Sequence, residues 1–483
     1  MNRRLSYGSV GAAALAIVLA AAFSPGWLML VVLGSAVVCG VLVAPRLTVP
    51  LLVLALVLQE VIARNLEVPA PDLASAVQSL DEIALVAAAV RAAWLVLSGD
   101  RSWIVWREWT WALVFVAFGL ASSLTHWSGA KPALLGLALS CKFFGFLVLA
   151  LSVPWKEGDA QRLLRVAYVA LPLVFAAGLF GHAFPDFTNR YFAAREGDTD
   201  YTRGGFTPFM VPFINPGLFG WTMAVLTLAA FTRATGEGKP ASWLMVMLGA
   251  AGVLLSLRRR PLLGIPVAIG AGLLQLTPRQ RVIAIGAAAA LVILVALFGG
   301  QLVQITIADT LQNYIDPQAR DQTARGAMLV ASVAIARGSF PLGVGFGRFG
   351  GFAAQHYYSS LYDDYGLSQI YGLSPDTPYY LTDTYWPHIW AEVGVLGAAA
   401  MLLMLAGTWR RSRAIGLDSR QPLEVRLVGL LGALLLVEGI VESLAGPVFE
   451  VSLQSLIIAL PLGMAIRLAR GRAPSSAPSI SKR

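Results

Sequence analysis

The sequence predicts an all-α, polytopic membrane protein with about 12 to 14 transmembrane helices and one long loop outside the membrane. Hydrophobic residues make up 57% of the 483 residues and charged residues only 13%, a balance far too apolar for a soluble domain of this length. The apolar residues gather in stretches close to the ~20 residues that cross a bilayer. One long polar segment, residues 301–385, interrupts them.

Fourteen apolar stretches fit the length of a membrane-crossing helix. Two of them, 242–257 and 261–276, are short and closely joined, so they form either a tight pair of spans or a re-entrant hairpin. Residues 1–23 also resemble a signal peptide, although retention as a first helix is the favoured interpretation. The stretches are residues 6–23, 26–44, 47–63, 81–98, 110–126, 132–152, 163–184, 208–232, 242–257, 261–276, 282–300, 386–409, 426–444 and 450–468.

The pattern of stretches and loops divides the chain into five regions. We expect an N-terminal transmembrane scaffold, a transmembrane region with a short outer loop and an arginine-rich hairpin, the long outer loop, the C-terminal transmembrane helices and a disordered tail. These regions are residues 1–184, 185–300, 301–385, 386–470 and 471–483, respectively.

The distribution of basic residues predicts the orientation. Most of the 36 Lys and Arg residues fall in the short loops and tails on one side of the membrane if the N-terminus is cytoplasmic, as the positive-inside rule requires. Both termini are then cytoplasmic and the long loop is outside. The net charge of +9 is explained by contact with anionic membrane lipids, so we expect no nucleic-acid partner. Cys39 and Cys141 both fall in predicted spans, which excludes a disulfide framework.

Titratable residues cluster where the long loop becomes an apolar helix. Asp383 or Thr384 is predicted to cap this helix, and Pro387 lies in its first turn, where a missing N–H costs nothing. Asp383, His388 and Glu392 are then placed between water and membrane, beside the positive end of a helix dipole. We interpret this stretch as one wall of an active site at the membrane surface.

Several arginines fall on the outer side in this topology. Arg258, Arg259 and Arg260 form a turn between two short spans, and Arg203 and Arg325 lie in the two outer segments. Positive residues are normally depleted on that side, so the alternative is a miscount that places the turn in the cytoplasm. Guanidinium groups match phosphate oxygens, and the phosphate-bearing ligand expected at the outer leaflet is a lipid diphosphate.

Lys142 is a charge in the middle of a predicted span. Such a charge costs at least ~2.5 kcal/mol on insertion scales, so it normally pairs with another group or serves a function. The sequence leaves both open: a structural ion pair or a role near the substrate. Arg91 lies near the end of its span and can extend its charged group to the interface.

The long loop has two recognisable parts. Residues 318–338 are predicted to form an amphipathic helix, and seven tyrosines follow between Tyr357 and Tyr380. Tyrosine with Asp and Ser suits the binding of sugar rings, but it is equally common in wet loops at a membrane interface.

Asp198-Thr199-Asp200 resembles the Asp-x-Asp that holds a metal ion in many nucleotide-sugar transferases. Its oxygen ligands would suit Mg²⁺ or Mn²⁺. So short a pattern arises easily in an acidic loop, so we expect no metal and no cofactor.

Four short motifs occur in order between residues 200 and 405. They are Arg203-Gly-Gly-Phe with Asn215-Pro-Gly, Ser256-Leu-Arg258, Arg325 with Pro341-Leu-Gly-Val-Gly345, and Glu392-x-Gly394-x-x-Gly397. Together they resemble the motifs of the bacterial O-antigen polymerase and O-antigen ligase family. The family's Asn-Pro-Asn reads Asn-Pro-Gly217 here, after a longer gap from Phe206. The family's His-Asn, nine residues before the Glu-x-Gly, is Asp383-Thr384, while His388 is only four residues away.

The resemblance implies the fold of class C glycosyltransferases and an active site on the periplasmic face of a bacterial inner membrane. It implies transfer of a glycan from a polyprenyl-diphosphate-linked oligosaccharide, with inversion and without metal. The acceptor is a sugar hydroxyl on another lipid-linked chain for a polymerase, or on a lipid core for a ligase, and no residue separates the two. A chain-length regulator protein is a further partner of this kind of enzyme.

The chemistry assigns roles to the candidate residues. Arg203, Arg258, Arg259 and Arg325 are expected to bind the diphosphate leaving group, and Asp383 or His388 to act as general base. Asp383 is favoured because it has the family spacing. The alternative for Asp383 is a purely structural role as a helix cap. The alternative for His388 is a structural hydrogen bond to Glu392 on the same helix face. The supporting residues are Glu392, Asn215 and Lys142.

A transporter or flippase is the competing class. It should show a repeat between its two halves and charges near the middle of the membrane. No repeat is evident, and the charges concentrate in the two outer segments, which favours chemistry at the outer face.

Overall fold

The computed structural model describes residues 25–192, 206–273 and 323–471, together with a few positions between 281 and 289. Over these ranges the protein is helical. None of the described residues belongs to a β-strand, and the nearest approach to one is an isolated bridge between Ser374 and Thr377. The predicted all-α class is confirmed for this part of the chain.

Eight helices in the described ranges are long and apolar enough to cross a membrane, as expected of a multi-pass membrane protein. A ninth span results if α7 (Ala130–Ser140) and α8 (Lys142–Ser152), which are bent by 48° at Cys141, cross together. The eight are α2 (Pro25–Val43), α3 (Pro45–Leu66), α6 (Trp106–Thr125), α9 (Glu157–Ala183), α11 (Pro216–Glu237), α20 (Trp386–Leu417), α21 (Leu423–Glu442) and α22 (Ser452–Arg470).

Three other predicted spans correspond to helices that do not reach this standard. They are α5 (Leu80–Leu97), which carries three charges, α12 (Pro240–Leu255) and α13 (Arg259–Leu273), which are short. The predicted stretch 6–23 and almost all of 282–300 lie outside the described residues, so the number of spans beyond these helices stays a prediction.

The start of one predicted span, 208–232, is wrong. Residues 207–215 are not helical, and α11 begins at Pro216. The reason is local: Asn215 accepts a hydrogen bond from the Leu218 backbone N–H at 2.7 Å and so caps the helix, and a proline follows at its first position.

Short helices complete the described fold. α17 begins at Ala324 after the cap Thr323, whose side chain accepts from the Gly326 N–H. The predicted helix 318–338 is thus confirmed from residue 324 onward, and residues 318–322 lie outside the described ranges. The remaining elements are α4 (Pro71–Gln78), α10 (Pro185–Tyr191), α17 (Ala324–Gly338), α18 (Gly351–Tyr357), α19 (Leu361–Asp364), η1 (Leu367–Gln369) and η2 (Ser443–Ala445).

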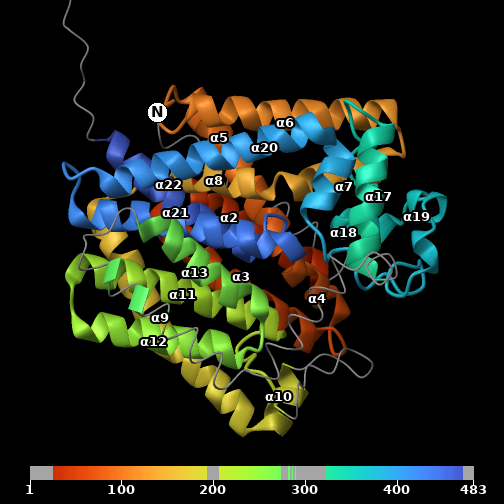
Figure 1. Cartoon of the computed structure of the whole chain (residues 1–483). Coiled ribbons are helices and arrows are strands. Elements are labelled where there is room, and N and C mark those ends of the chain that lie inside the picture. Colours follow the sequence, from red (N-terminus) through yellow and green to blue (C-terminus); the bar gives the residue numbers. More distant parts are fainter. Residues whose placement is uncertain are drawn as a thin grey trace, which may run out of the picture.

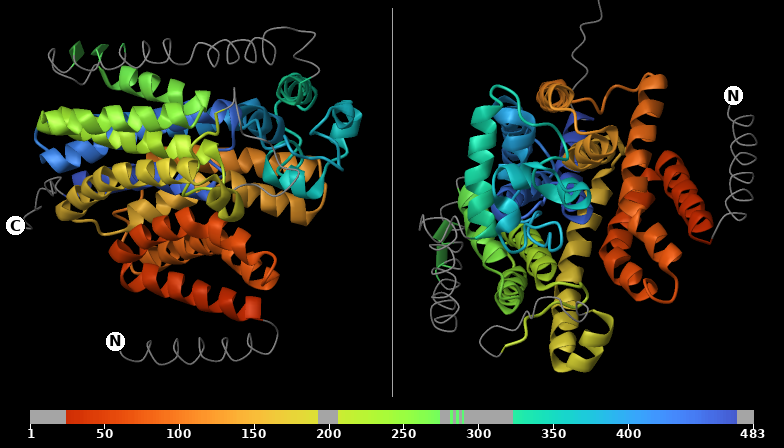
Figure 2. Two further views of the ribbon diagram at one scale, coloured as in Figure 1. Left: turned by 90° about the horizontal axis from the view of Figure 1, so that it is seen from below. Right: turned by 90° about the vertical axis from the view of Figure 1, so that its right-hand side faces the viewer.

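The C-terminal helices form the centre of the bundle. α21 and α22 are buried along most of their length, and they lie between the red helices α2–α3 and the green helices α12–α13 (Figure 2). α2, α3 and α9 instead leave many apolar side chains exposed. In a membrane these faces meet lipid tails, which are as apolar as the side chains themselves.

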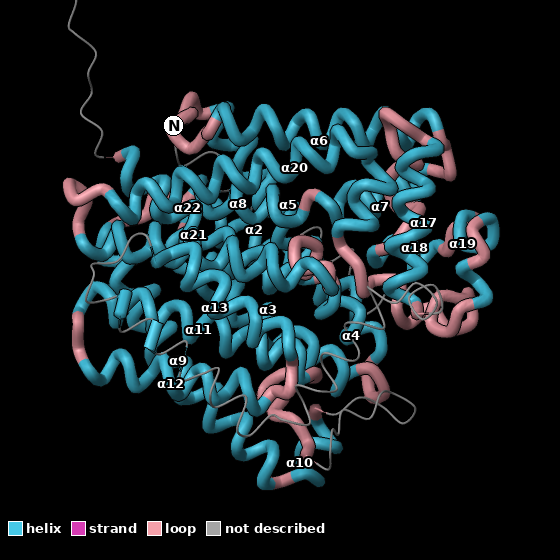
Figure 3. The backbone as a smooth tube through the Cα atoms, viewed as in Figure 1, coloured by secondary structure: helices cyan, strands magenta, loops and turns pink. Residues whose placement is uncertain are grey.

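The bundle has two distinct ends (Figure 1). The segment of residues 324–385, with α17, α18 and α19, lies at one end, which we call the loop end. α20 runs from there to the opposite end, and its short turn to α21 lies at that far side (Figure 3). We call this opposite end the basic end because Arg411, Arg420, Arg467 and Arg470 lie in or beside the last turns and loops there.

Candidate active site at the loop end

Arg325 and Asp383, two of the predicted site residues, form an ion pair. The Nη2 of Arg325 lies 2.7 Å from the Oδ2 of Asp383, and the two side chains stay 26% and 28% exposed. Arg325 belongs to the first turn of α17, and Asp383 lies in a turn in which its N–H donates to the Tyr380 carbonyl. The fold therefore unites a cation and a carboxylate from distant stretches of chain at an accessible place.

The prediction that Asp383 or Thr384 caps α20 is wrong. The capping position is Tyr385, and no side chain caps the helix. Asp383 faces Arg325 instead, and Thr384 is buried. Pro387 does lie in the first turn, as predicted.

Two glycine-containing motifs that are far apart in the sequence pack against each other. α20 is broken at Gly394, where φ is +76° and ψ is 168°, so nearby carbonyls lose their helical partners. The Ala391 and Glu392 carbonyls accept instead from the N–H groups of Val344 and Gly345, both at 2.9 Å. The Glu-x-Gly-x-x-Gly and Pro-Leu-Gly-Val-Gly motifs thus form one structural joint.

Close approach explains why glycine occupies the joint. A Cβ at Gly394 would lie 2.6 Å from the carbonyl carbon of Leu342, and one at Gly343 would lie 2.3 Å from the Glu392 carbonyl oxygen. Two serines of α6, which no sequence pattern indicated, complete the joint. Ser122 Oγ accepts from the Gly343 N–H and Ser123 Oγ from the Phe346 N–H, both at 2.9 Å.

His388 is buried and fully engaged. Its Nδ1 lies 2.8 Å from the Phe349 carbonyl oxygen, and its Nε2 lies 2.6 Å from the Oε1 of Glu450. A carbonyl can only accept, so Nδ1 carries a proton, and Nε2 and the Glu450 carboxyl share another. Because both ring nitrogens bind protein groups and the side chain is only 3% exposed, His388 of α20 connects the loop at Phe349 to the turn that precedes α22.

Glu392 also holds the loop against α20. Its Oε1 accepts from the backbone N–H groups of Arg348 and Phe349, at 2.6 and 2.8 Å, and its Oε2 lies 3.5 Å from the His388 Nδ1. We call His388, Glu392 and Glu450 the buried triad. Glu450 could not be predicted from the sequence, because no local pattern connects it to residues so far away on the chain.

The arginine turn lies at the same end of the bundle, with Arg258 directly before α13 and Arg259 and Arg260 in its first turn. Arg260 Nη1 is 3.2 Å from Glu442 Oε1 and donates to the Ala445 carbonyl at 2.5 Å. Glu442 is the last residue of α21, which returns from the basic end to the loop end, and Ala445 ends η2 directly after it. The alternative that placed this turn on the side opposite the long loop is therefore wrong for this fold.

The same terminus of α21 connects the turn to the start of α20. Trp386, three residues after Asp383, donates its indole N–H to Ser443 Oγ at 3.0 Å. Glu438, one helical turn before Glu442, accepts from the Trp221 indole N–H at 2.8 Å. The sequence singled out Arg258 and Arg259 in this turn, whereas Arg260 holds it to α21.

Asn215 and Lys142 have structural partners. Asn215 caps α11, as described above. Lys142 Nζ lies 2.5 Å from Asp81 Oδ2, and both are largely buried, so the ion-pair alternative describes its contacts. Ser452 Oγ also donates to Asp81 at 2.8 Å, which places this pair beside the segment that carries Glu450.

The tyrosines of the long loop divide into two groups. Tyr358 and Tyr362 stack on each other with ring centroids 5.0 Å apart, and their hydroxyls bind the Leu373 carbonyl and the Gly350 N–H. Burial, with a contribution from Asp363, raises the pKa of Tyr358 to about 12, and burial also raises the pKa of Tyr362. Tyr371 and Tyr379 are instead 70% and 57% exposed, so only such exposed rings remain for a ligand.

Three residues singled out in the sequence lie outside the described ranges: Arg203, Asp198 and Asp200. In the ranges that are described, no three His, Cys, Asp or Glu side chains are placed to hold a metal ion.

No family model matches the chain, and no curated protein matches it either. The likeness to the O-antigen family therefore rests on the four short motifs. The geometry offers a partly exposed carboxylate beside a guanidinium, at one end of a bundle of apolar helices.

Proposed function

We propose that this protein is a polysaccharide polymerase of the membrane. It transfers a glycan from a polyprenyl-diphosphate-linked donor to a sugar hydroxyl at the outer surface of a bacterial inner membrane. The observation that carries the proposal is the partly exposed Arg325–Asp383 pair at the loop end, with its Oδ2 to Nη2 distance of 2.7 Å.

The pair supplies the two groups that the displacement needs. In the free protein Arg325 neutralises Asp383. A bound diphosphate competes for the guanidinium, which binds phosphate oxygens well, and so releases the carboxylate. Asp383 then takes the proton of the acceptor hydroxyl while the hydroxyl oxygen forms a bond to the anomeric carbon. The bond from that carbon to the diphosphate oxygen breaks, and fixed guanidinium groups stabilise the departing charge.

The burial pattern favours Asp383 over His388 as the base. A general base must come within hydrogen-bonding distance of the proton that it removes. Asp383 is 28% exposed on its side chain, whereas His388 is 3% exposed and both its nitrogens are engaged. His388 is therefore assigned a positioning role.

The arginine turn extends the anion site. Arg260 is held by Glu442 and the Ala445 carbonyl, which fixes the turn at the loop end. Arg258 and Arg259 are proposed to contact the diphosphate, together with Arg203. The exposed Tyr371 and Tyr379, whose ring centroids lie 6.4 Å apart, are proposed to contact the glycan, because aromatic faces suit sugar rings.

The orientation of the proposed enzyme follows from its charge. In this proposal the basic end faces the cytoplasm, as the positive-inside rule predicts, and the loop end faces the periplasm. Polyprenyl-diphosphate donors are presented on that side in this proposal. The cytoplasmic position of both termini is the expectation from the sequence. The partners are the lipid-linked oligosaccharide, the glycan acceptor, membrane lipids and a chain-length regulator protein.

Deletion of the gene, followed by gel analysis of surface glycans and complementation, tests the proposal. We expect single repeat units in place of long chains, restored by the wild-type protein but not by Asp383→Asn or Arg325→Ala. Asp376→Asn is a matched control because Asp376 is an exposed carboxylate of the same loop. Uncapped lipid core would instead indicate a ligase, retention of the donor inside the cell a flippase, and unchanged glycan would refute all three.

A further inference from the structure

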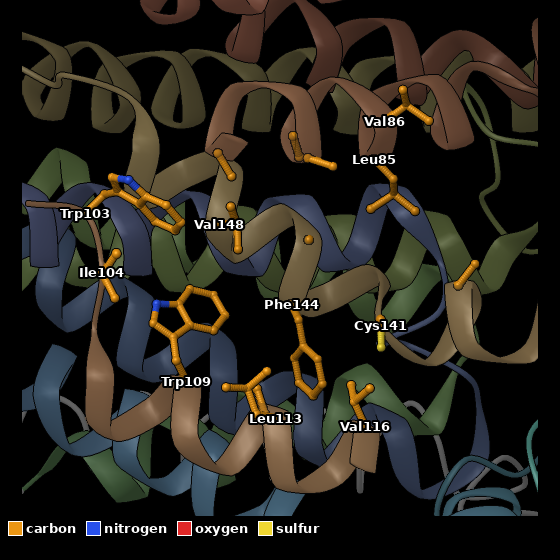
Figure 4. Close-up of a pocket in the computed structure, with 16 residues that line it drawn as sticks. Leu85, Val86, Trp103, Ile104, Trp109, Leu113, Val116, Cys141, Phe144 and Val148 are labelled. Carbon is orange, nitrogen blue, oxygen red and sulfur yellow. The ribbon is translucent and has the colours of Figure 1, made fainter. Parts of the chain in front are cut away.

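An apolar cleft of about 630 Å³ opens between α5, α6 and the α7–α8 bend. Figure 4 shows it as an open middle with Trp103 and Ile104 at one end and Cys141 and Val116 toward the other. Its volume falls within the roughly 300–1,000 Å³ typical of small-molecule sites. The site at the loop end does not include any of its lining residues.

The lining lacks the polar groups that a sugar or nucleotide site needs. Its walls are aliphatic and aromatic side chains, such as Leu85, Phe144 and Val148. Two indole N–H groups belong to the lining: that of Trp103 donates to the Asp100 carbonyl at 3.1 Å, and that of Trp109 is buried without a hydrogen-bond partner. Ligand pockets usually place a few polar groups to orient their ligand, so this cleft suits a hydrocarbon chain.

The cleft opens on a face that meets lipid. Val86 and Leu113, which line it from α5 and α6, are 56% and 67% exposed. Exposed aliphatic residues at this density on two predicted membrane helices face acyl chains rather than water. A hydrocarbon chain can therefore enter sideways from the bilayer.

A second hollow, of about 820 Å³, lies at the basic end. Lys156, Arg467 and Arg470 line it with Ser102 and one acidic residue, Glu157, so it is positive. We call it the basic pocket. Ser102 is followed directly by Trp103 and Ile104 of the apolar cleft, so consecutive residues of one loop line both hollows.

The arginines of the basic pocket are fixed to that loop. Arg470 Nη1 donates to the carbonyls of Ser102 and Ile104, at 3.2 and 2.7 Å. Arg467 donates to Ser102 Oγ and lies 3.6 Å from Asp100. Fixed guanidinium groups are suited to binding a phosphate, and basic pockets at the cytoplasmic side of membrane helices recognise anionic headgroups.

We propose that the apolar cleft and the basic pocket together bind one anionic phospholipid from the leaflet at the basic end. One acyl chain occupies the cleft, and the phosphate lies beside Lys156, Arg467 and Arg470. The charge of the pocket and its place next to a hydrocarbon-lined cleft select this occupant. The site does not depend on the proposed polymerase activity.

Native mass spectrometry of the purified full chain tests the proposal. Phosphatidylglycerol and phosphatidylcholine with the same acyl chains are the probes, and phosphatidylglycerol should be retained several-fold better. Ala89→Trp fills the cleft from an exposed position and should abolish retention. Val166→Trp, at an exposed apolar position of α9 outside the cleft, should not.

The headgroup contact has its own pair of variants. Lys156→Gln should weaken phosphatidylglycerol binding about fivefold, the effect of losing one basic residue near a membrane surface. Arg410→Gln, an exposed basic residue of the same end outside the pocket, should have no effect. Equal retention of the two lipids, or equal behaviour within either pair of variants, would overturn the proposal. Displacement of the lipid by excess inorganic phosphate would also overturn it. So would the loss of a dimer rather than of lipid in Ala89→Trp, because the occupant of the cleft would then be a second copy of the chain.

A labelling experiment on the unmodified protein covers the case in which Ala89→Trp fails to fold. Cys141 lines the cleft, whereas Cys39 is exposed on α2. In vesicles containing phosphatidylglycerol, an apolar maleimide should label Cys141 more slowly than in phosphatidylcholine vesicles, with Cys39 unchanged. Equal rates at Cys141 would contradict lipid occupancy of the cleft.

Discussion

Asp383 and His388 lie five residues apart in the sequence, yet their surroundings are opposite. Asp383 pairs with Arg325 at a partly exposed place, whereas His388 is enclosed with Glu392 and Glu450. Water stabilises the first pair in either state, so it is free to exchange partners with a ligand. The buried triad has no such substitute, so it fixes the position of the loop. One short stretch thus contains both the proposed general base and the buried histidine that holds the loop in place.

Removing Glu450 should have the largest effect on folding. Glu450→Ala leaves a buried histidine without its partner, which costs roughly 3–5 kcal/mol for a broken buried pair. We expect a large drop in the unfolding temperature in detergent, followed by intrinsic fluorescence. Glu450→Gln keeps an acceptor and should lose less. An unfolding temperature equal to that of Asp376→Ala, a change at an exposed carboxylate, would refute the fastening role.

Gly394→Ala should have the next largest effect. The residue has φ of +76°, where a side chain is strained, and the new Cβ would meet the Leu342 backbone. We expect a loss of more than about 1 kcal/mol, measured in the same unfolding assay. Gly270→Ala in α13 is the control, because a Cβ there meets nothing within 4 Å. Equal stability of the two variants would argue against a strained joint.

Asp383→Asn should hardly change stability but should abolish activity. A partly exposed ion pair contributes about 0–1 kcal/mol, so the unfolding temperature should stay close to that of the wild type. Loss of a general base should slow glycan transfer by ~10²–10⁴-fold, measured with purified protein and a lipid-linked oligosaccharide. A destabilised Asp383→Asn protein would make the pair structural and would remove the contrast with the buried triad.

The smallest effect is expected at Tyr358, whose pKa is raised to about 12. In the unfolded protein the tyrosine ionises near its ordinary pKa of about 10. The neutral, buried Tyr358 therefore makes its full contribution to the free energy of unfolding below pH 10, and this contribution is lost as the pH rises toward 12. Tyr358→Phe should flatten the decline in unfolding temperature between pH 10 and 12. An unchanged slope would contradict the raised pKa.

The sequence determined the class of fold and most helix positions, because a membrane span is a local property of some twenty apolar residues. Local rules also determined the start of α11, since Asn215 and Pro216 cap and open it, although the hydrophobic pattern alone placed that start too early. The same local reasoning misassigned the cap of α20. A capping residue and an ion-pair partner look alike in sequence, and only the position of Arg325 separates them.

Tertiary structure decided which charges are buried and with what they pair. Arg325, Asp383, His388 and Glu392 could be chosen from their residue types and spacing, but nothing local connects His388 to Glu450 or the glycine motifs to Ser122 and Ser123. Those contacts arise when helices distant in the chain pack side by side. Hydrophobic stretches therefore specify the elements, whereas the surroundings of each polar group depend on the neighbours that packing brings to it.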